Sequence, residues 1–336
     1  MPKAPSSLPV SALFGVIKPS GPTSMSLIND IKVLVGKSRL FVEAEKLKQQ
    51  ENSKNSKKRG KRKDKFAGPV KIGQGGTLDP LADGVLVVGI GKGTKKLQEF
   101  LDCVKEYKTT CILGCETDSY DSEGAQVRIA PWRHVTREKV EEALQQFRGE
   151  IMQAPPIFSA LKMDGKPYYE YARSGIPLPR PIEKRKATVH SLEVFDWLGS
   201  DHGFRYPEKK FSAEQQQALQ QTLQSVEQDA VVKDEPEEEA GEAPPTAFVL
   251  RMRVGGGTYV RSIVHDLGHA LGSAAHVVTL QRSRQKNFTL EPAEERDRAC
   301  VPWEVFEKAL KEPGEPDEDG WLEWEREVMD KYEIVE

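Results

Sequence analysis

The chain of 336 residues carries 49 Lys and Arg, 52 Asp and Glu and 38% hydrophobic residues. This composition supports one or two domains with a buried core and excludes a wholly disordered chain. No apolar run approaches the roughly 20 residues that cross a bilayer, and the first residues lack a secretion signal, so we expect a protein that is neither membrane-bound nor secreted. Four cysteines without a C-x-x-C pair indicate reduced thiols rather than a disulfide framework.

The formal net charge of -3 conceals three strongly charged blocks. Lys46 to Lys71 holds eleven basic and two acidic residues, whereas Glu227 to Glu242 and Glu312 to Glu336 are acidic. A basic cluster within the first block suits phosphate contact or nuclear import, and a solvated loop is the alternative. The cluster consists of Lys57, Lys58, Arg59, Lys61, Arg62 and Lys63.

The predicted elements begin with a strand at Leu13 to Val16. An amphipathic helix follows, with apolar residues at helical spacing behind Ser24 as the N-cap candidate. Residues 37–69 lose this periodicity and predict a polar insertion or mobile loop. Order resumes at Val70, and the apolar run Val85 to Ile90 predicts a buried strand before a helix that starts near Thr94.

Short strands and helices then alternate. Strands are expected at Tyr107–Leu113, Ile157–Met163, Ala187–Trp197 and Phe248–Val254, and helices at Glu138–Phe147, Tyr168–Arg173 and Thr258–Leu271. The mixture predicts an α+β fold with a mixed, mostly antiparallel sheet flanked by helices. The composition of residues 199–245 predicts a second solvated insertion, partly helical at Ala213–Val226. Residues 291–336 are predicted to form an acidic C-terminal extension. One folded domain is therefore expected to span 13–290.

Two glycine-rich runs carry the candidate chemistry. In Gly73 to Leu86 the backbone is free to approach a ligand, and Asp79 lies at the tip. An aspartate before proline is also a common turn former, and that interpretation stays open.

The second run, Gly255 to Arg261, enters a predicted helix with Thr258 as a hydroxyl cap. Arg261 then falls in the first helical turn. It either pairs with a buried carboxylate, holding that group ionised, or is solvated beside a glycine hinge.

His265 and His269 lie four apart on the same predicted helix, a spacing that suits zinc. No glutamate follows His265 to act as a base, and the neighbouring residues predict an ordinary amphipathic helix with partly exposed imidazoles. We therefore predict no metal site.

At these residues the sequence resembles the TruB family of pseudouridine synthases. The resemblance covers Phe14 to Asn287 apart from the two insertions. It rests on separated motifs in the family's order: Lys18-Pro19 with Gly21 and Ser24, Gly75 to Leu86, Lys105-Glu106-Tyr107, Ser159-Ala160-Leu161-Lys162, Glu170-Tyr171-Ala172-Arg173 and Gly257 to Arg261. It implies the pseudouridine synthase fold and, from the eukaryotic members, isomerisation of uridine 55 in the T-loop of tRNA.

The resemblance also implies roles for single residues. Asp79 is the catalytic aspartate, Tyr107 stacks on the target base, and Arg261 is the ion-pair partner of Asp79. Substrate-binding positions are Lys18, Gln74, Gly76, Thr77, Tyr259 and Leu280. The family usually has histidine where this chain has Gln74, and we expect that change to alter how the loop engages RNA rather than the chemistry.

The implied reaction needs no metal and no organic cofactor. The expected partner is the T-arm of tRNA, and whether messenger RNA is also a substrate stays open; neither a guide RNA nor a membrane is expected. We also expect a monomer without a PUA domain, located in the nucleus, with the mitochondrion as an open alternative. Two alternatives stay open: a guide-RNA-dependent synthase, and a non-catalytic RNA-binding or tRNA-folding protein on the same scaffold, which would not need an Asp79–Arg261 pair.

Overall fold

The computed structural model of the chain describes residues 5, 7–55, 69–174, 176, 178–210, 234–235 and 243–336. The chain divides into two compact units. The first comprises Met1–Lys105 and Gln281–Glu336, and the second comprises Glu106–Leu280. Strand β12 (Ala275–Gln285) supplies its first residues to the second unit and its last to the first.

The first unit is built on strands in the order β15-β1-β3-β12. The long central pairing, between β1 (Ala12–Lys18) and β3 (Asp83–Ile90), is antiparallel. The pairings of β15 (Val301–Pro302) with β1 and of β12 with β3 are parallel. Short strands extend this part of the sheet: β2 (Ile72–Gln74), β13 (Phe288–Thr289), β14 (Arg298–Ala299) and β16 (Glu333–Ile334).

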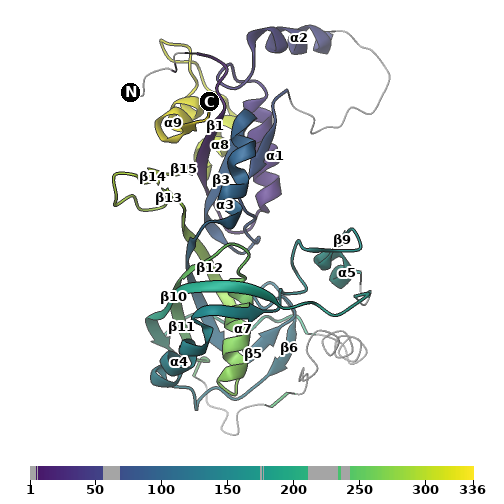
Figure 1. Cartoon of the computed structure of the whole chain (residues 1–336), viewed down its shortest axis with the longest axis vertical. Coiled ribbons are helices and arrows are strands. Elements are labelled where there is room, and N and C mark those ends of the chain that lie inside the picture. The colour runs from purple at the N-terminus through teal and green to yellow at the C-terminus, as the bar shows by residue number, and fades with distance from the viewer. Residues whose placement is uncertain are drawn as a thin grey trace. The chain divides into compact units, whose positions relative to one another are not determined.

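Helices from both ends of the sequence cover this unit (Figure 1). They are α1 (Ser24–Val35), α2 (Ala44–Asn55), η1 (Gly91–Lys96), α3 (Leu97–Asp102), α8 (Trp303–Lys311) and α9 (Glu323–Lys331). One core cluster joins Phe14 of β1, Ile31 of α1, Phe306 of α8 and Trp324 of α9. The C-terminal helices are therefore part of the hydrophobic core of the first unit.

The second unit continues with strands in the order β12-β4-β11-β10-β7. The pairings of β10 with β11 and of β10 with β7 are antiparallel. The strands are β4 (Lys105–Leu113), β7 (Gly149–Gln153), β10 (Arg185–Gly199) and β11 (Ala247–Val254), with the separate pairs β5 (Cys115–Thr117) and β6 (Gln126–Ile129), and β8 (Lys162–Met163) and β9 (Lys166–Pro167). The helices are α4 (Arg137–Ala143), η2 (Leu144–Phe147), α5 (Tyr168–Arg173) and α7 (Val260–Ala270).

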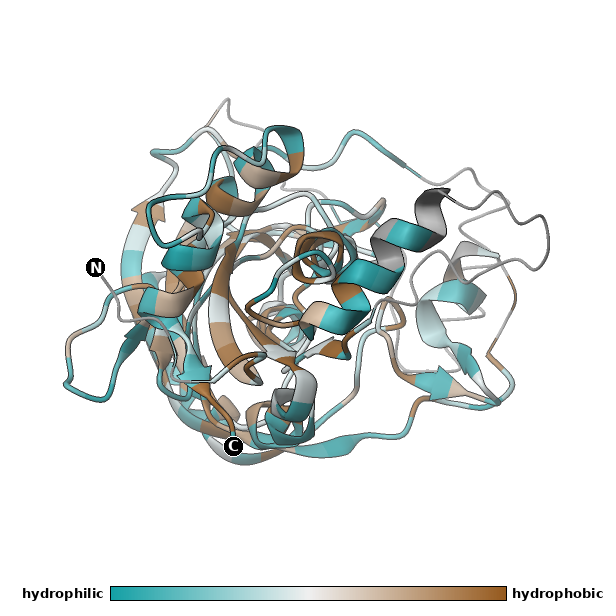
Figure 2. Cartoon of the chain, turned by 90° about the horizontal axis from the view of Figure 1, so that it is seen from above, coloured by the Kyte–Doolittle hydropathy of each residue, from teal (hydrophilic) through white to brown (hydrophobic). Residues whose placement is uncertain are grey.

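Hydrophobic residues, coloured brown in Figure 2, form long stretches of several strands, whereas the helices alternate between brown and teal. Helix α7, for example, buries Ile263, Val264 and Leu267. Among the described residues, the structure contains no helix with the length and apolar character of a membrane span. The predicted α+β class with a mixed, mostly antiparallel sheet is confirmed.

Several boundaries differ from the sequence-based expectation. Residues 37–69 are not uniformly loop, because Leu40 and Phe41 are buried in the core and α2 follows them. The start of the segment 199–245 is also packed, since Phe204 and Tyr206 contact a core cluster of the second unit. The helix expected at 213–226 lies outside the described residues. The strand expected at Ile157–Met163 is wrong except for its last two residues.

The expected acidic extension at 291–336 is not separate from the rest of the fold. It forms β14, β15, α8, α9 and β16, and it belongs to the same compact unit as β1 and α1. Its acidic residues lie mainly on exposed positions, while Trp321 and Trp324 are buried. The acidic composition of this segment hid the apolar residues that are spaced between its charges.

Candidate active site

Asp79 lies on the loop between β2 and β3 and is half-buried. The loop makes a close approach to helix α3: a Cβ atom on Gly75 would stand 2.6 Å from the Cβ of Phe100. Gly76 has a φ of 136°, a backbone conformation that glycine adopts without strain. The glycines predicted from the sequence thus allow the chain to turn tightly just before Asp79.

Two side chains near the N-terminus fix the residues on either side of Asp79. The Lys18 ammonium is fully buried and donates to the carbonyl oxygens of Pro80 at 3.1 Å and Ala82 at 2.6 Å. The Ser24 hydroxyl both donates to the carbonyl oxygen and accepts from the amide of Leu78, each at 2.9 Å. Ser24 is therefore an anchor of this loop, and Thr23 is the N-cap of α1 instead, accepting from the amide of Ser26.

Two buried side chains from β12 hold the glycine part of the same loop. Arg282 donates to the carbonyl oxygens of Gly76 at 2.9 Å and Val85 at 2.7 Å. Gln285 donates to the carbonyl oxygen of Gly75 at 2.6 Å. Buried backbone carbonyls need such partners, and here they come from residues about 200 positions away. The loop that carries Asp79 is therefore rigidly held from two sides.

Gln74 and Thr77 stand next to each other at the start of this loop. The Gln74 amide nitrogen donates to the Thr77 hydroxyl at 3.0 Å and lies 3.9 Å from the Met25 sulfur. Thr77 and Met25 are exposed, and the Met25 side chain is 52% accessible. The Gln74 amide is thus oriented by a neighbouring hydroxyl.

In the second unit, Arg261 lies in the first turn of α7 and is only 4% exposed. Its guanidinium donates to the carbonyl oxygens of Ser119 at 2.6 Å and Phe158 at 2.9 Å, and its Nε lies 3.7 Å from the Asp121 carboxylate. The alternative of a solvated Arg261 is therefore wrong. The expected pairing of Arg261 with Asp79 stays a prediction.

The other predicted residues of this unit also have defined places. Tyr107 lies in β4 and Leu280 in β12, and both are buried, at 8% and 6% exposed. Tyr259 is the N-cap residue of α7, and Gln153 of β7 accepts from its amide at 2.8 Å and donates to its carbonyl oxygen at 2.9 Å. Thr258 is not the cap, because its hydroxyl donates to the carbonyl oxygen of Gly255.

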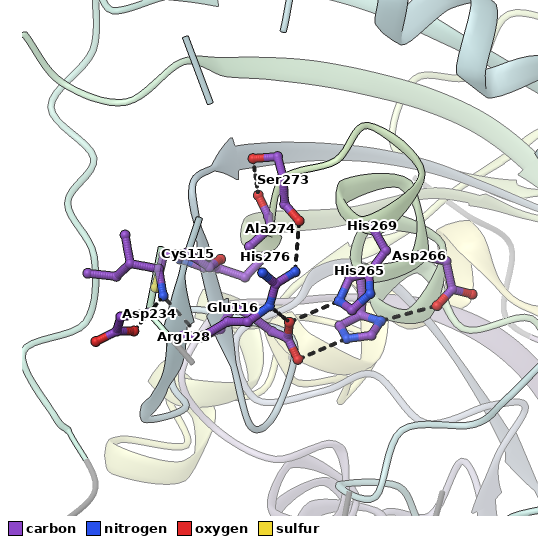
Figure 3. Close-up of polar contacts among 11 residues, drawn as sticks. Cys115, Glu116, Arg128, Asp234, His265, Asp266, His269, Ser273, Ala274 and His276 are labelled. Atoms are coloured by element: carbon purple, nitrogen blue, oxygen red, sulfur yellow. Dashed lines mark hydrogen bonds and ion pairs between the residues drawn. The ribbon is translucent and has the colours of Figure 1, made fainter. Parts of the chain in front are cut away.

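A buried charged cluster surrounds Glu116 of β5 (Figure 3). The Glu116 carboxylate contacts His265 at 3.1 Å, His269 at 2.9 Å and Arg128 at 3.0 Å. His265 is 2% exposed, so the expectation of partly exposed imidazoles is wrong for it. The glutamate that the local sequence lacked comes from a strand almost 150 positions earlier.

The cluster shifts the titration of its members. Burial by itself would raise the pKa of Glu116, but the charge of His265 and the hydrogen bonds from both imidazoles hold that pKa well below its usual range. Burial would likewise lower the pKa of His265, but the Glu116 charge and the bond to Asp266 raise it to about 10. His265 is therefore a buried imidazolium at neutral pH.

His276 behaves in the opposite way. It is fully buried in β12, where its Nδ1 donates to the carbonyl oxygen of Cys115 at 2.8 Å. Burial lowers the pKa of His276 to about 4, and the bond to Cys115 offsets only part of that effect. The folded protein thus keeps His276 neutral at pH values where the unfolded chain protonates it.

We expect this difference to destabilise the fold in acid. Between pH 6.5 and 4 the unfolded state binds the additional proton, so stability falls as pH falls, by up to about 3 kcal/mol from this residue. A His276→Gln variant should show a smaller loss of unfolding free energy between pH 7 and pH 4 in urea titrations. Parallel losses in the two proteins would contradict the assignment.

Comparisons with known proteins identify the family of this chain. Residues 62–217 match the model of the TruB family pseudouridylate synthase (N terminal domain). A Schizosaccharomyces pombe protein named tRNA pseudouridine synthase 4 is 36% identical over 343 residues, which cover 88% of this chain and 82% of that protein. The chain belongs to the TruB family of pseudouridine synthases. The mouse pseudouridylate synthase TRUB1 is 34% identical over 92% of this chain and 77% of its own length.

Among solved structures, a chain of a Cbf5-Nop10-Gar1 complex aligns with a TM-score of 0.49 and 22% identity, covering 96% of this chain and 60% of that chain.

The family resemblance predicts roles for Asp79, Arg261 and Tyr107, but it did not predict four distant side chains that contact the Asp79 loop or helix α7. Arg282, Gln285, Glu116 and Asp121 had no local signal in the sequence, because each acts on a segment distant along the chain. The six basic residues from Lys57 to Lys63 lie outside the described residues, and their contact with RNA stays a prediction.

Proposed function

We propose that this protein isomerises uridine to pseudouridine at position 55 in the T-loop of tRNA. Membership of the TruB family supports the reaction, and relatives named tRNA pseudouridine synthase support the substrate. The single observation that carries the proposal is the loop with Asp79, a half-buried carboxylate on a backbone held by Lys18, Ser24, Arg282 and Gln285. A fixed carboxylate is what the chemistry needs.

The reaction rearranges one nucleotide without adding or removing atoms. The bond between N1 of uracil and C1′ of ribose breaks, and a bond between C5 and C1′ forms. C5 loses its proton and N1 gains one, so the formula does not change. No oxidant, reductant or energy source is required, which agrees with the expectation that the protein needs no cofactor.

Asp79 is proposed as the catalytic carboxylate. Cleavage of a glycosidic bond develops positive charge on the sugar. An ionised carboxylate at a fixed position can stabilise that charge, attack C1′, or accept a proton from the ribose. All three roles require the charged form and a fixed geometry, and the four anchors of the loop provide the geometry.

The target uridine must leave its stack before it can react. Unstacking costs a few kcal/mol, which an aromatic side chain can offset by stacking on the extruded base. We assign that role to Tyr107, with Leu280 and Tyr259 beside the base, and Gln74, Gly76 and Thr77 contacting the RNA from the Asp79 loop. Arg261 is proposed to hold the Asp79 carboxylate ionised, as an arginine does for a buried partner.

The proposal is tested with the purified chain and an unmodified tRNA transcript, without any other protein or RNA. We expect pseudouridine at position 55, mapped by mass spectrometry after nuclease digestion, and none in a transcript with cytidine at that position. Product only at another uridine would contradict the position. Binding of the transcript without any product would favour the non-catalytic RNA-folding alternative, and product only with added RNA would favour a guide-dependent synthase.

A further inference from the structure

One turn supplies both a main-chain and a side-chain acceptor to Arg261. Residues 118–124 connect β5 to the strand β6, and two of them, Ser119 and Asp121, contact the Arg261 guanidinium. The turn is tightly bonded internally: the Thr117 hydroxyl donates to the carbonyl oxygen of Asp121 at 2.7 Å, and the Ser119 hydroxyl donates to the Asp121 carboxylate at 2.6 Å. The position of this turn therefore sets the position of the Arg261 guanidinium.

His265 contacts both Glu116, just before this turn, and Tyr120 within it. It lies four residues after Arg261 on α7, so both side chains project from the same face of the helix. Its Nε2 lies 3.1 Å from the carboxylate of Glu116, which precedes the turn, and the Tyr120 ring stacks on the imidazole with centroids 3.8 Å apart. Tyr120 has a φ of 63°, an uncommon conformation that brings its ring to this place.

Three other ionisable side chains contact His265 or Glu116. Asp266 lies 3.1 Å from Nδ1 of His265, and Arg128 and His269 contact the far side of the Glu116 carboxylate (Figure 3). Arg128 is itself buried and also donates to the carbonyl oxygen of Ser273 at 2.9 Å. Each nitrogen of the His265 ring faces a carboxylate oxygen, which an imidazolium satisfies with its two donors.

The same residues have the composition of a metal site, because ligand atoms of Glu116, His265 and His269 lie within 4.8 Å of one another. The Arg128 guanidinium argues against that use. It is bonded to one Glu116 oxygen at 3.0 Å, and a divalent cation on this carboxylate would stand beside a buried positive charge. The charges of the cluster balance without a metal. The carboxylates of Glu116 and Asp266 face the Arg128 guanidinium and the His265 imidazolium.

We propose that Glu116 and His265 are positioning residues for Arg261. They clamp the turn 118–124 against helix α7, and this clamp holds Ser119 and Asp121 where they orient the guanidinium. The inference rests on the proposed function for its catalytic consequence, because Arg261 is assigned there to the Asp79 carboxylate. The clamp itself involves only residues of the second unit.

Two variants test the clamp by different changes. Glu116→Gln keeps the shape and removes the charge that His265 faces, and Tyr120→Asn removes the stacked ring while placing a residue that tolerates positive φ. Glu141→Gln makes the same chemical change in an exposed pair with Arg137 on α4 and is the matched control. All are assayed well below their unfolding temperatures with the tRNA transcript.

We expect the two clamp variants to lower kcat by about 10-fold to 100-fold while KM and tRNA binding stay within about 2-fold, since small misplacements reduce rate more than affinity. Glu141→Gln should match the wild type. Unchanged kcat in both folded clamp variants would overturn the proposal. So would a Zn2+-dependent rise in the melting temperature of the wild type that Glu116→Gln abolishes, because the cluster would then be a metal site.

A readout that needs no catalysis separates this proposal from the function. The buried Arg261 Nε–H should give a slowly exchanging NMR signal, identified by its loss in Arg261→Lys. We expect its exchange to become at least about 10-fold faster in Glu116→Gln and in Tyr120→Asn, and to stay unchanged in Glu141→Gln. If the wild type makes no pseudouridine, the proposed function fails, and unchanged exchange in the clamp variants would still overturn the clamp.

Discussion

The Asp79→Asn variant is expected to lose pseudouridine formation by on the order of 1,000-fold or more while it still folds and binds tRNA. Asparagine has nearly the same size and shape, but it carries no charge at neutral pH. The neutral amide cannot stabilise positive charge on the sugar, attack C1′ or accept a proton. Each proposed role of Asp79 therefore predicts the same loss.

The variant should fold because side chains other than that of Asp79 anchor the main chain on either side of it. Lys18 binds the carbonyl oxygens of Pro80 and Ala82, and Ser24 binds the backbone of Leu78. The change leaves all of these groups in place. A large loss of activity can then be attributed to the missing charge and not to a displaced loop.

Asp83→Asn is a suitable control because it removes a carboxylate charge four residues further along, at the start of β3. Asp83 is half-buried, as Asp79 is, and asparagine has nearly the same size, so the amide should fit at that position. Product is measured as pseudouridine per tRNA under single-turnover conditions, and binding by filter retention. Appreciable product from Asp79→Asn, or an equal loss in Asp83→Asn, would contradict the role of Asp79.

The sequence predicted the elements whose own residues show an apolar periodicity. Apolar residues at the right spacing marked β1, α1, β3, β10, β11 and α7, because each buries a face made of neighbouring residues. Helix α2 was missed for the opposite reason: Ala, Glu, Lys and Gln favour a helix, but its sequence shows no apolar stripe. Strand β12 also went unmarked, although it supplies Arg282 and Gln285 to the loop.

The residues of the candidate site differ in the same way, since some have a local signal in the sequence and others do not. Asp79 and Arg261 belong to glycine-rich runs that are visible in the sequence, and the family resemblance gave them roles. The residues that position them come from elsewhere, as Glu116 does for His265 across 149 positions. A pair of that kind has no local spacing to detect, since only the fold brings β5 and α7 together. The glutamate beside the two histidines therefore could not be foreseen from the local sequence, nor could the Arg128 guanidinium that disfavours a metal there.

The Trp324→Ala variant should lose about 3 to 5 kcal/mol of unfolding free energy, as large-to-small changes at buried aromatics do. Trp324 is 2% exposed and packs against Phe41, at 6.4 Å between ring centroids, and Phe306, at 6.2 Å. Truncation would leave a cavity between α9, α8 and the segment before α2. An acidic tail outside the fold would show no such loss.

The neighbouring Glu323→Ala variant is the matched control. Glu323 is exposed and forms an ion pair with the exposed Lys308, so its loss should change stability by no more than about 0.5 kcal/mol. Urea titration gives the free energies, and hydrogen exchange with mass spectrometry assigns them to peptides. Faster exchange should appear in peptides of β1, α1 and α8, which share the core cluster with Trp324, more than in those of β10 and β11. Equal effects of the two substitutions would contradict the assignment of α9 to this core, because a helix that merely lay on the surface would not transmit the loss of one buried ring to β1.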